Sequence, residues 1–294
     1  MSLSRFLFCL VATGCLLAGC AKPPSEAPLA SARSAADAAL VTRSVQTVAD
    51  RIAERPMPQQ LFSHGALGGR TLAVSSTADI VLRPGEVVLT FDDGPRPGRT
   101  NAILATLADF NVRATFLMLG ASAEAHPALA QQVARSGHTV GSHTYGHVDL
   151  SQLSRQAALD EIAKGEDAVQ AALARGGQTI SPFFRFPYLA QTGFLRTSLL
   201  QSSAVVLDVD IDSKDYYRDA PATIVERTMA RLRARGSGII LFHDIHARTV
   251  ETLPLVLARL RDEGYSVVRL VPRASGVFGR DLITAAGPDV SETL

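Results

Sequence analysis

Two adjacent carboxylates, Asp92 and Asp93, end an apolar stretch and are the first residues along the chain whose types suggest chemistry. Residues 87–91 (Val-Val-Leu-Thr-Phe) have the composition of a buried parallel strand, because they lack the polar alternation of a half-exposed one. Successive strand side chains point to opposite faces, so the carboxylates can separate at the strand's end, one towards a cation and one towards a substrate. Taken alone, the stretch is equally compatible with a turn that merely ends a strand.

A pair of histidines, His143 and His147, follows another short apolar run. Two imidazoles four residues apart can converge on one cation if the backbone is helical or tightly turned. One carboxylate and two histidines form a common catalytic set for Zn²⁺ or a similar divalent ion. Most His pairs at this spacing belong simply to the surface or the core. Here both histidines and both aspartates come directly after predicted strands, where parallel α/β folds place their active sites.

Three further stretches carry polar residues behind apolar runs. His243 can donate a proton near neutral pH if a carboxylate raises its pKa. Arg185 can pair with a catalytic Asp and fix its orientation. Tyr216 and Tyr217 could stack on a sugar ring beside a cleft, although a tyrosine more often only packs. Four acidic residues precede these tyrosines: Asp208, Asp210, Asp212 and Asp215.

From residue 86 onward, short apolar strands alternate with helical patterns. The predicted strands are 87–91, 114–119, 139–142, 183–186, 204–209, 238–242 and 265–270. The predicted helices are 101–109, 127–135, 154–175, 194–201, 222–235 and 250–263, with Thr249 as the N-cap of the last one. This alternation indicates a parallel sheet with helices outside, either a closed barrel or an open doubly wound sheet. No glycine-rich phosphate-binding motif follows a strand, so we expect no nucleotide partner.

The first 19 residues have the pattern of an export signal, with Arg5, an apolar run over residues 6–17 and then small residues. The run is shorter than the roughly 20 apolar residues that span a bilayer. Residues 17–20 (Leu-Ala-Gly-Cys) resemble the lipobox of bacterial lipoproteins, where Cys20 becomes the lipidated first residue. An ordinary signal peptide is the alternative. Ala21, rather than Asp, follows the cysteine, which favours an outer-membrane lipoprotein facing the periplasm if the source is Gram-negative.

Charge and cysteine content exclude several classes of protein. Removal of residues 1–19 takes away one basic residue and no acidic one, which leaves 28 of each. This balance argues against a nucleic-acid partner, which calls for a basic face. The three cysteines of the chain all lie within residues 9–20, so the remaining domain has no disulfide and no cysteine-based metal site. Any metal must therefore be bound by His, Asp or Glu.

The five stretches, in this order, resemble the motifs of the polysaccharide deacetylase family, the NodB-homology domain of carbohydrate esterase family 4. Residues 90–93 match its Thr-Phe-Asp-Asp motif, residues 143–147 match His-Ser/Thr-x-x-His, and residues 185–188 match Arg-x-Pro-Tyr. Residues 212–216 resemble Asp-x-x-Asp-Trp, and residues 241–243 match Leu-x-His. Tyr216 replaces the frequent Trp, and Leu189 stands where a Gly is frequent. The resemblance implies a distorted (β/α) barrel of about seven parallel strands.

The resemblance also assigns roles at the metal. Asp93, His143 and His147 would hold one divalent ion, most simply Zn²⁺. Asp92 would be the general base that takes a proton from water, and Arg185 would orient it. A carboxylate, two histidines and a second carboxylate suffice, without the resemblance, to predict metal-assisted hydrolysis.

Further roles follow from the resemblance on the substrate side. His243 would protonate the leaving amine, with Asp215 holding it charged. The backbone N–H of Tyr188 would meet the oxyanion. Leu241 would line the pocket for the acetyl methyl, and Tyr216 would form part of the cleft wall.

These roles predict a metal-dependent hydrolase that removes N-acetyl groups from N-acetylhexosamine residues of an envelope or extracellular polysaccharide. Peptidoglycan, a chitin-like polymer and poly-N-acetylglucosamine are all compatible. An O-deacetylase of an acetylated polysaccharide and a non-catalytic carbohydrate-binding lipoprotein are the alternatives. The expected organisation is a lipoprotein signal peptide (1–19), a tether and accessory segment (20–84), the deacetylase domain (85–275) and a tail (276–294). Within the accessory segment, residues 34–54 are predicted to be helical.

Overall fold

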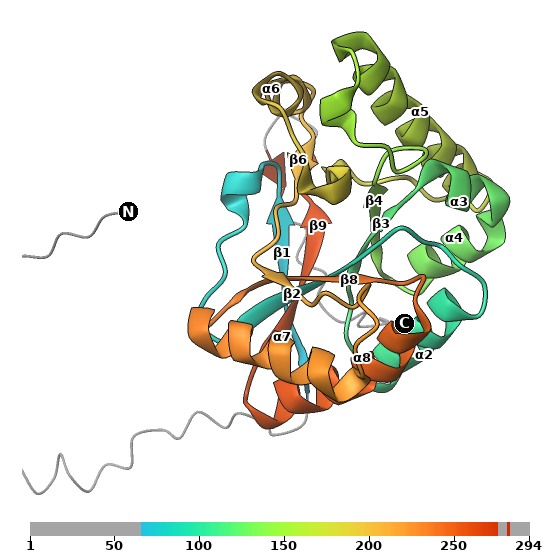
Figure 1. Ribbon diagram of the computed structural model, residues 1–294. Helices are drawn as coiled ribbons and strands as arrows, with labels where there is room; N and C mark the ends of the chain where they lie inside the picture. The colour runs from blue at the N-terminus through green and yellow to red at the C-terminus, as the bar shows by residue number, and fades with distance from the viewer. Residues whose placement is uncertain (1–65, 276–280, 283–294) are drawn as a thin grey trace, which may run out of the picture. The chain divides into compact units, whose positions relative to one another are not determined.

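The computed structural model describes residues 66–275 and 281–282 (Figure 1). The predicted export signal, Cys20 and the predicted helix 34–54 lie outside the described residues, as does most of the predicted tail. The described segment begins before residue 85, and its first strand belongs to the same sheet as the predicted domain.

Seven parallel strands form a nearly closed barrel. They are β2 (Glu86–Asp92), β3 (Thr115–Met118), β4 (Thr139–Ser142), β5 (Phe183–Phe184), β6 (Val205–Val206), β7 (Ile211–Asp212) and β8 (Gly238–His243). The pairing runs from β6 through β5, β4, β3 and β2 to β8 and β7. Within the described residues no strand pairing joins β6 to β7, and this seam leaves the barrel open on one side. The alternation of elements allowed two architectures, and the barrel is the one observed.

Helices surround the barrel between its strands (Figure 1). They are α2 (Arg99–Asp109), α3 (Gly120–Ala125), α4 (Pro127–Arg135), α5 (Arg155–Ala174), α6 (Gly193–Gln201), α7 (Pro221–Arg235) and α8 (Ala247–Asp262), with three short 3₁₀ turns, η1 (Thr77–Asp79), η2 (Leu150–Gln152) and η3 (Pro187–Leu189). Local signals set several of the ends. The Ser154 side chain accepts a hydrogen bond from Ala157 N–H at the start of α5, and Gly236 ends α7 in the left-handed conformation.

The predicted start of the last helix is wrong. Thr249 lies inside α8, which begins at Ala247, instead of capping it. Its hydroxyl donates 2.6 Å to the carboxylate of Asp215, a partner far away in sequence. The polar side chain that suggested a cap is therefore used in tertiary structure.

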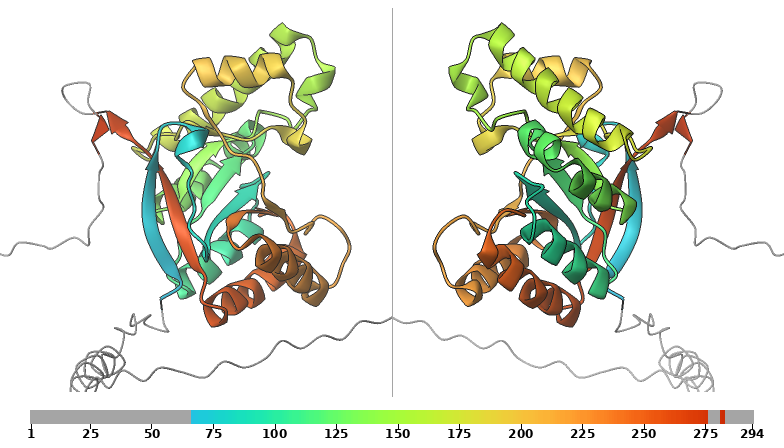
Figure 2. Two further views of the ribbon diagram at one scale, coloured as in Figure 1. Left: turned by 90° about the vertical axis from the view of Figure 1, so that its left-hand side faces the viewer. Right: turned by 90° about the vertical axis from the view of Figure 1, so that its right-hand side faces the viewer.

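Two strands that pair with each other lie across one end of the barrel (Figure 2). β1 (Gly68–Val74) pairs in parallel with β9 (Ser266–Pro272), and β9 also pairs with the first residues of β2. Their side chains Val74, Val268 and Leu270 join a buried cluster with inward-facing residues of the barrel. Neither β1 nor β7 was predicted. A two-stranded antiparallel ribbon, β10 (Ala274–Ser275) with β11 (Asp281–Leu282), follows β9.

The alternation of side chains along β2 explains how the core positions the site. Val87, Leu89 and Phe91 face the helices and belong to the largest buried cluster, whereas Val88 belongs to the barrel interior. Asp92 has the same parity as Val88, so its side chain ends on the interior face, at the C-terminal mouth of the barrel. All seven residues of β2 are buried, as predicted for a central parallel strand.

In the described part of the chain, no helix combines the length and apolar character that crossing a bilayer requires.

Candidate active site

A cleft of about 390 Å³ opens at the C-terminal ends of the barrel strands. It brings together side chains from all five motifs that the sequence singled out. Eight of the predicted residues line it: Asp92, Asp93, His143, His147, Tyr188, Tyr216, Leu241 and His243. The other two, Arg185 and Asp215, are buried behind this wall with exposures of 1% and 0%. This location is the one that parallel α/β barrels use for their active sites.

Asp93, His143 and His147 present three ligand atoms to one point. Asp93 Oδ1 lies 3.6 Å from His143 Nε2 and 3.4 Å from His147 Nε2. All three ligand atoms lie within 4.8 Å of one another. Asp93 Oδ1 is buried without a hydrogen-bond partner, which is costly unless a cation or another donor completes the site. The donor set and the unsatisfied oxygen both fit a divalent metal ion.

The backbone at two of the candidate metal ligands adopts unusual conformations that orient the side chains. Asp93 has φ of 78° and His147 has φ of 57°, both in the left-handed region that residues other than glycine seldom adopt. At Asp93 this conformation places the carboxylate beside both histidines. Such outliers persist where the surrounding structure fixes them, which is common at functional sites.

A hydrogen bond to the backbone fixes the tautomer of His143. Its Nδ1 lies 2.8 Å from the carbonyl oxygen of Arg185, so Nδ1 carries the proton and Nε2 keeps its lone pair for a cation. Burial lowers the pKa of His143 despite the nearby charges of Asp92 and Asp93. The ring is therefore neutral at neutral pH, the state in which imidazole binds metals.

Arg185 holds Asp92 from inside the barrel. Its Nη1 donates hydrogen bonds of 2.8 Å to Asp92 Oδ1 and to Thr90 Oγ1. Its Nε donates a hydrogen bond of 3.0 Å to the carbonyl oxygen of Leu207. These bonds satisfy a guanidinium that is 1% exposed. Because Oδ1 is engaged, Asp92 turns its other oxygen, Oδ2, towards His143, 3.8 Å from its Nε2. One carboxylate oxygen is thus anchored, and the other faces His143, one of the candidate metal ligands.

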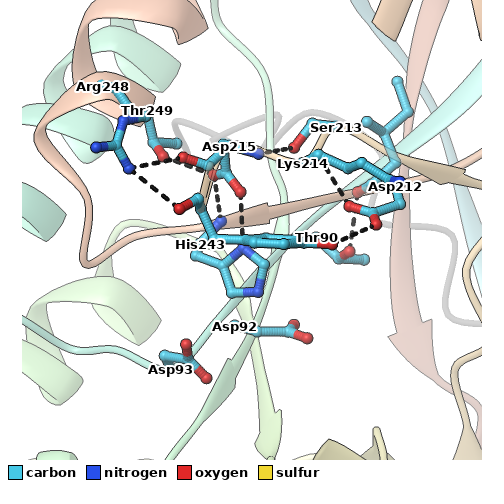
Figure 3. A network of polar contacts seen from close by, with 12 residues as sticks. Thr90, Asp92, Asp93, Asp212, Ser213, Lys214, Asp215, His243, Arg248 and Thr249 are labelled. Atoms are coloured by element: carbon cyan, nitrogen blue, oxygen red, sulfur yellow. Dashed lines mark hydrogen bonds and ion pairs between the residues drawn. The ribbon is translucent and has the colours of Figure 1, made fainter. Parts of the chain in front are cut away.

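His243 ends β8, the strand that pairs with β2, and is held by a second buried carboxylate (Figure 3). Its Nδ1 lies 2.7 Å from Asp215 Oδ1, while Asp215 Oδ2 accepts from the His243 backbone N–H and from Thr249. Burial alone lowers the pKa of His243, but the hydrogen bond and charge of Asp215 outweigh it and raise the pKa to about 9. In Figure 3, Asp92 and Asp93 lie on the side of the ring away from Asp215.

The four acidic residues 208–215 separate into two pairs. Asp208 and Asp210 form ion pairs with Arg196 and Arg235, outside the cleft. Asp215 contacts His243, and Asp212 lines the cleft and accepts 3.0 Å from the hydroxyl of Tyr216. Burial together with this bond raises the pKa of Tyr216 to about 12, so its hydroxyl stays protonated.

Sequence reasoning missed three residues that support this constellation. Thr90 accepts a hydrogen bond from Arg185, and Thr249 donates one to Asp215. In the sequence, both threonines resemble ordinary strand and cap residues. Asp244 is 1% exposed and accepts 2.6 Å from Thr100, and a side chain at Gly94 would collide with its carboxylate. Burial raises the pKa of Asp244 to about 7. Its position beside His243, at the end of a strand, was the only available signal.

Comparisons with known proteins agree with this geometry. A family model described as polysaccharide deacetylase matches residues 81–203. The chain is 34% identical over 198 residues to the chitin deacetylase of Colletotrichum lindemuthianum, covering 63% of this chain and 78% of that protein. It is 32% identical over 186 residues to the peptidoglycan-N-acetylglucosamine deacetylase PgdA of Listeria monocytogenes, covering 63% of this chain but only 38% of PgdA. The match therefore spans well under half the length of that relative.

A solved structure shares the fold. The peptidoglycan deacetylase Bd3279 of Bdellovibrio bacteriovorus superposes with a TM-score of 0.60 at 34% sequence identity, covering 71% of this chain and 56% of that one. The residues that the family model matches include three of the five motifs, since residues 81–203 contain the paired aspartates, the two histidines and Arg185 to Tyr188. The chain belongs to the polysaccharide deacetylase family.

Proposed function

We propose that this protein is a metal-dependent hydrolase that removes N-acetyl groups from N-acetylhexosamine residues of an envelope or extracellular polysaccharide. The observation that carries the proposal is the meeting of two proton-transfer groups and a candidate metal site in one cleft. Asp92, a carboxylate anchored by Arg185, lies beside the three metal-ligand atoms, and the imidazole of His243, paired with Asp215, lines the same cleft. The names of the relatives, which act on peptidoglycan and chitin, support an N-acetylated glycan as the substrate.

Asp93, His143 and His147 are the proposed metal ligands, with one ion per chain and zinc as the expected metal. When bound, a divalent ion supplies Lewis acidity, which polarises an acyl oxygen and acidifies a water molecule. The hydrogen bond from His143 Nδ1 to the backbone carbonyl oxygen of Arg185 keeps Nε2 available for this ion.

The proton steps are assigned to Asp92 and His243. Asp92 Oδ2 accepts a proton from the attacking water, while Arg185 holds Oδ1 and so fixes the carboxylate plane. His243 donates its Nε2 proton to the amine nitrogen as the C–N bond breaks, and Asp215 holds Nδ1. The products are acetate and a free amino sugar, and water supplies the added oxygen and proton.

Three residues are assigned to the acetyl group and the sugar. The Tyr188 backbone N–H is the proposed donor to the tetrahedral oxyanion, and its ring packs edge-on to His147 at 4.5 Å between ring centres. Leu241 is buried at the base of the cleft, where an acetyl methyl needs an apolar surface. Tyr216, 40% exposed, packs edge-on to His243 and offers a ring face to the sugar.

Two alternatives remain to be separated from this proposal by experiment. An O-deacetylase needs the same base and metal but has an alkoxide leaving group, which depends less on a general acid. A non-catalytic carbohydrate-binding protein needs no base beside a metal site, so the buried Arg185–Asp92 pair speaks against it. The test is acetate release from a panel of N- and O-acetylated glycans, with and without added zinc. Zinc-dependent release from N-acetylated glycans supports the proposal, and release from none of them overturns it.

We also propose that the protein is an envelope lipoprotein anchored through Cys20, on the strength of the lipobox-like residues 17–20. Several acyl chains are needed for stable anchoring, since one chain holds a protein only marginally. Cys20→Ser is expected to release the protein from membranes or leave the precursor unprocessed. Fractionation and mass spectrometry of the N-terminus measure this. A wild-type protein that is wholly soluble and carries no lipid contradicts the assignment.

A further inference from the structure

A second hollow adjoins the catalytic cleft on the far side of the metal-ligand residues. Asp93 and His147 line both hollows. The second hollow, about 650 Å³, runs between the loop after β2 and helix α3 and includes Arg96, Pro97 and His126. It continues through Pro97 and His126 into a third hollow of about 580 Å³ along α4, which ends near Gln132 and Arg135. We call these two hollows the α4 groove. Its length suits further units of a polymer whose reacting sugar lies in the cleft.

Two arginines, Arg96 and Arg135, line the α4 groove. Arg96 is exposed, and in the described part of the chain no carboxylate lies within ion-pair distance of its guanidinium. Its backbone is nonetheless held firmly, because its N–H donates 2.8 Å to Thr100 Oγ1. Among the described residues, the side chain of Arg135 donates a hydrogen bond to the amide oxygen of Gln131 and forms no ion pair. Some arginines elsewhere on the surface, such as Arg196 and Arg227, form ion pairs with Asp208 and Asp219.

Acidic side chains are scarce along the α4 groove. The only acidic residue that lines it is Asp93, which is assigned to the metal ion. Helix α4 begins in the groove at Pro127, and no side chain caps its first turn, so the positive end of the helix dipole adds to the potential. The catalytic cleft, in contrast, is lined by three carboxylates, Asp92, Asp93 and Asp212.

We infer that the α4 groove is a binding subsite for a carboxylate-bearing unit of the glycan strand, with Arg96 as its anchor. The inference rests on the proposed function, because it places this unit next to the sugar that is deacetylated. A guanidinium fork matches a carboxylate with two parallel hydrogen bonds, which a neutral sugar cannot replace. The substrate class is therefore an acidic N-acetylated glycan, such as one with ether-linked carboxylates on alternate sugars, in preference to a neutral homopolymer.

The test compares Arg96→Gln with wild type on three matched substrates. These are a neutral N-acetylglucosamine oligomer, a peptide-free strand that alternates N-acetylglucosamine with N-acetylmuramic acid, and the same strand with its carboxylates amidated. A peptide-bearing strand serves as a fourth arm, which separates a carboxylate on the sugar from one on an attached peptide. For wild type we expect higher kcat/KM on the acidic strand than on the amidated one, and the difference should shrink with salt.

Arg96→Gln should lower kcat/KM on the acidic strand by about 3- to 10-fold, mainly through KM, and leave the two neutral substrates unchanged. Arg83→Gln is the matched control, because Arg83 is also exposed but precedes β2, at the opposite end of the barrel. Equal effects of Arg96→Gln on all substrates, no effect on any, or equal wild-type rates on free and amidated strands overturn the inference.

Equilibrium binding of the acidic and amidated strands, measured by calorimetry, keeps the two proposals separate. If wild type releases no acetate from any glycan but binds the acidic strand better, and Arg96→Gln removes that preference, the subsite stands and the proposed function fails. If acetate is released but binding shows no preference for the free carboxylates, the proposed function stands and the subsite fails.

Discussion

Two neighbouring residues of the same type, Asp92 and Asp93, acquire different surroundings within one peptide unit. Asp92 ends a regular strand and receives the guanidinium of Arg185, whereas the left-handed backbone at Asp93 directs its carboxylate to the two histidines. The two side chains are chemically identical, but their surroundings differ. One oxygen of Asp92 accepts a hydrogen bond from Arg185, whereas one oxygen of Asp93 is buried without a hydrogen-bond donor.

Exchange of each carboxylate for an amide should separate the two roles. Asp92→Asn keeps the shape but cannot accept a proton, so it should retain the metal and lose about 10²- to 10⁴-fold in rate, the usual contribution of a general base. Asp93→Asn should weaken metal binding, and excess zinc should restore part of its rate. Metal content and acetate release are measured for both variants. Loss of metal from Asp92→Asn but not from Asp93→Asn would reverse the assignment.

The pH profile should report on the bond between His243 and Asp215. A general acid must be protonated, so the rate should fall as pH rises through the pKa of His243, which Asp215 raises to about 9. A bound divalent cation opposes the negative charges of Asp92 and Asp93. The alkaline limb of the pH–rate profile of the metal-loaded enzyme therefore lies at a lower pH than that value. Asp215→Asn removes the main charge that raises this pKa, and the alkaline limb should move to lower pH. An unmoved limb in a folded variant would exclude His243 as the acid.

Residue types and spacing predicted which residues form the site but only some of the contacts among them. The two aspartates, the two histidines and His243 were found because each follows a strand, where side chains from distant segments meet. Which of four crowded aspartates would contact His243 depended on the path of the loop after β7, and periodicity does not encode that path. The contacts of Thr90 and Thr249 with buried charges are tertiary, and threonine occurs both in strands and at helix N-caps, so its type does not predict them.

At the scale of elements, helix α5 supports the turn that carries the histidines. Gly165 faces this turn so closely that a Cβ there would lie 2.2 Å from the carbonyl carbon of Thr144 and 2.6 Å from Tyr145 N. Both neighbours are backbone atoms and cannot rotate away. The absence of a side chain at one position in α5 therefore sets how near the segment from His143 to His147 can lie to the helix.

Gly165→Ala should displace this turn, although alanine is the better helix former. We expect a loss of about 1–3 kcal/mol in the free energy of unfolding and weaker metal binding. Denaturant titration and zinc affinity measure the two effects. Gly193→Ala, at the start of α6, is the matched control, because nothing lies within 4 Å of its added Cβ and its stability should change little. Equal stability and zinc affinity for Gly165→Ala and wild type would show that the contact is unimportant.

Several of the elements that sequence patterns missed are short. β7 contains two residues and α3 contains six, so neither shows a full period of a hydrophobic pattern. β5 and β6 also contain two residues each, but they were predicted because they belong to longer apolar runs. β1 was missed because Gly68 and Gly69 at its start are typical of a loop, although both pack close to neighbouring backbone.

For the whole molecule, the alternation of strands and helices predicted the layers but not the closure of the sheet. A barrel and an open sheet have the same order of elements, and the choice between them depends on which strands become neighbours. The resemblance to a known family supplied the barrel. Sequence also gave no reason to place residues 68–74 in the sheet, where β1 pairs with β9.

The seam between β6 and β7 has a consequence for how the protein responds to heat. β7 pairs with β8 alone, and the loop after it carries Asp215, so this edge should open locally at a lower free energy than the central strands. In native-state hydrogen exchange, amides of residues 210–215 should lose protection before those of β2. Because opening removes the partner of His243, acetate release should cease reversibly several degrees below cooperative unfolding. Uniform protection across both segments, with activity lost only at the unfolding midpoint, would mean that the seam opens only with the rest of the barrel.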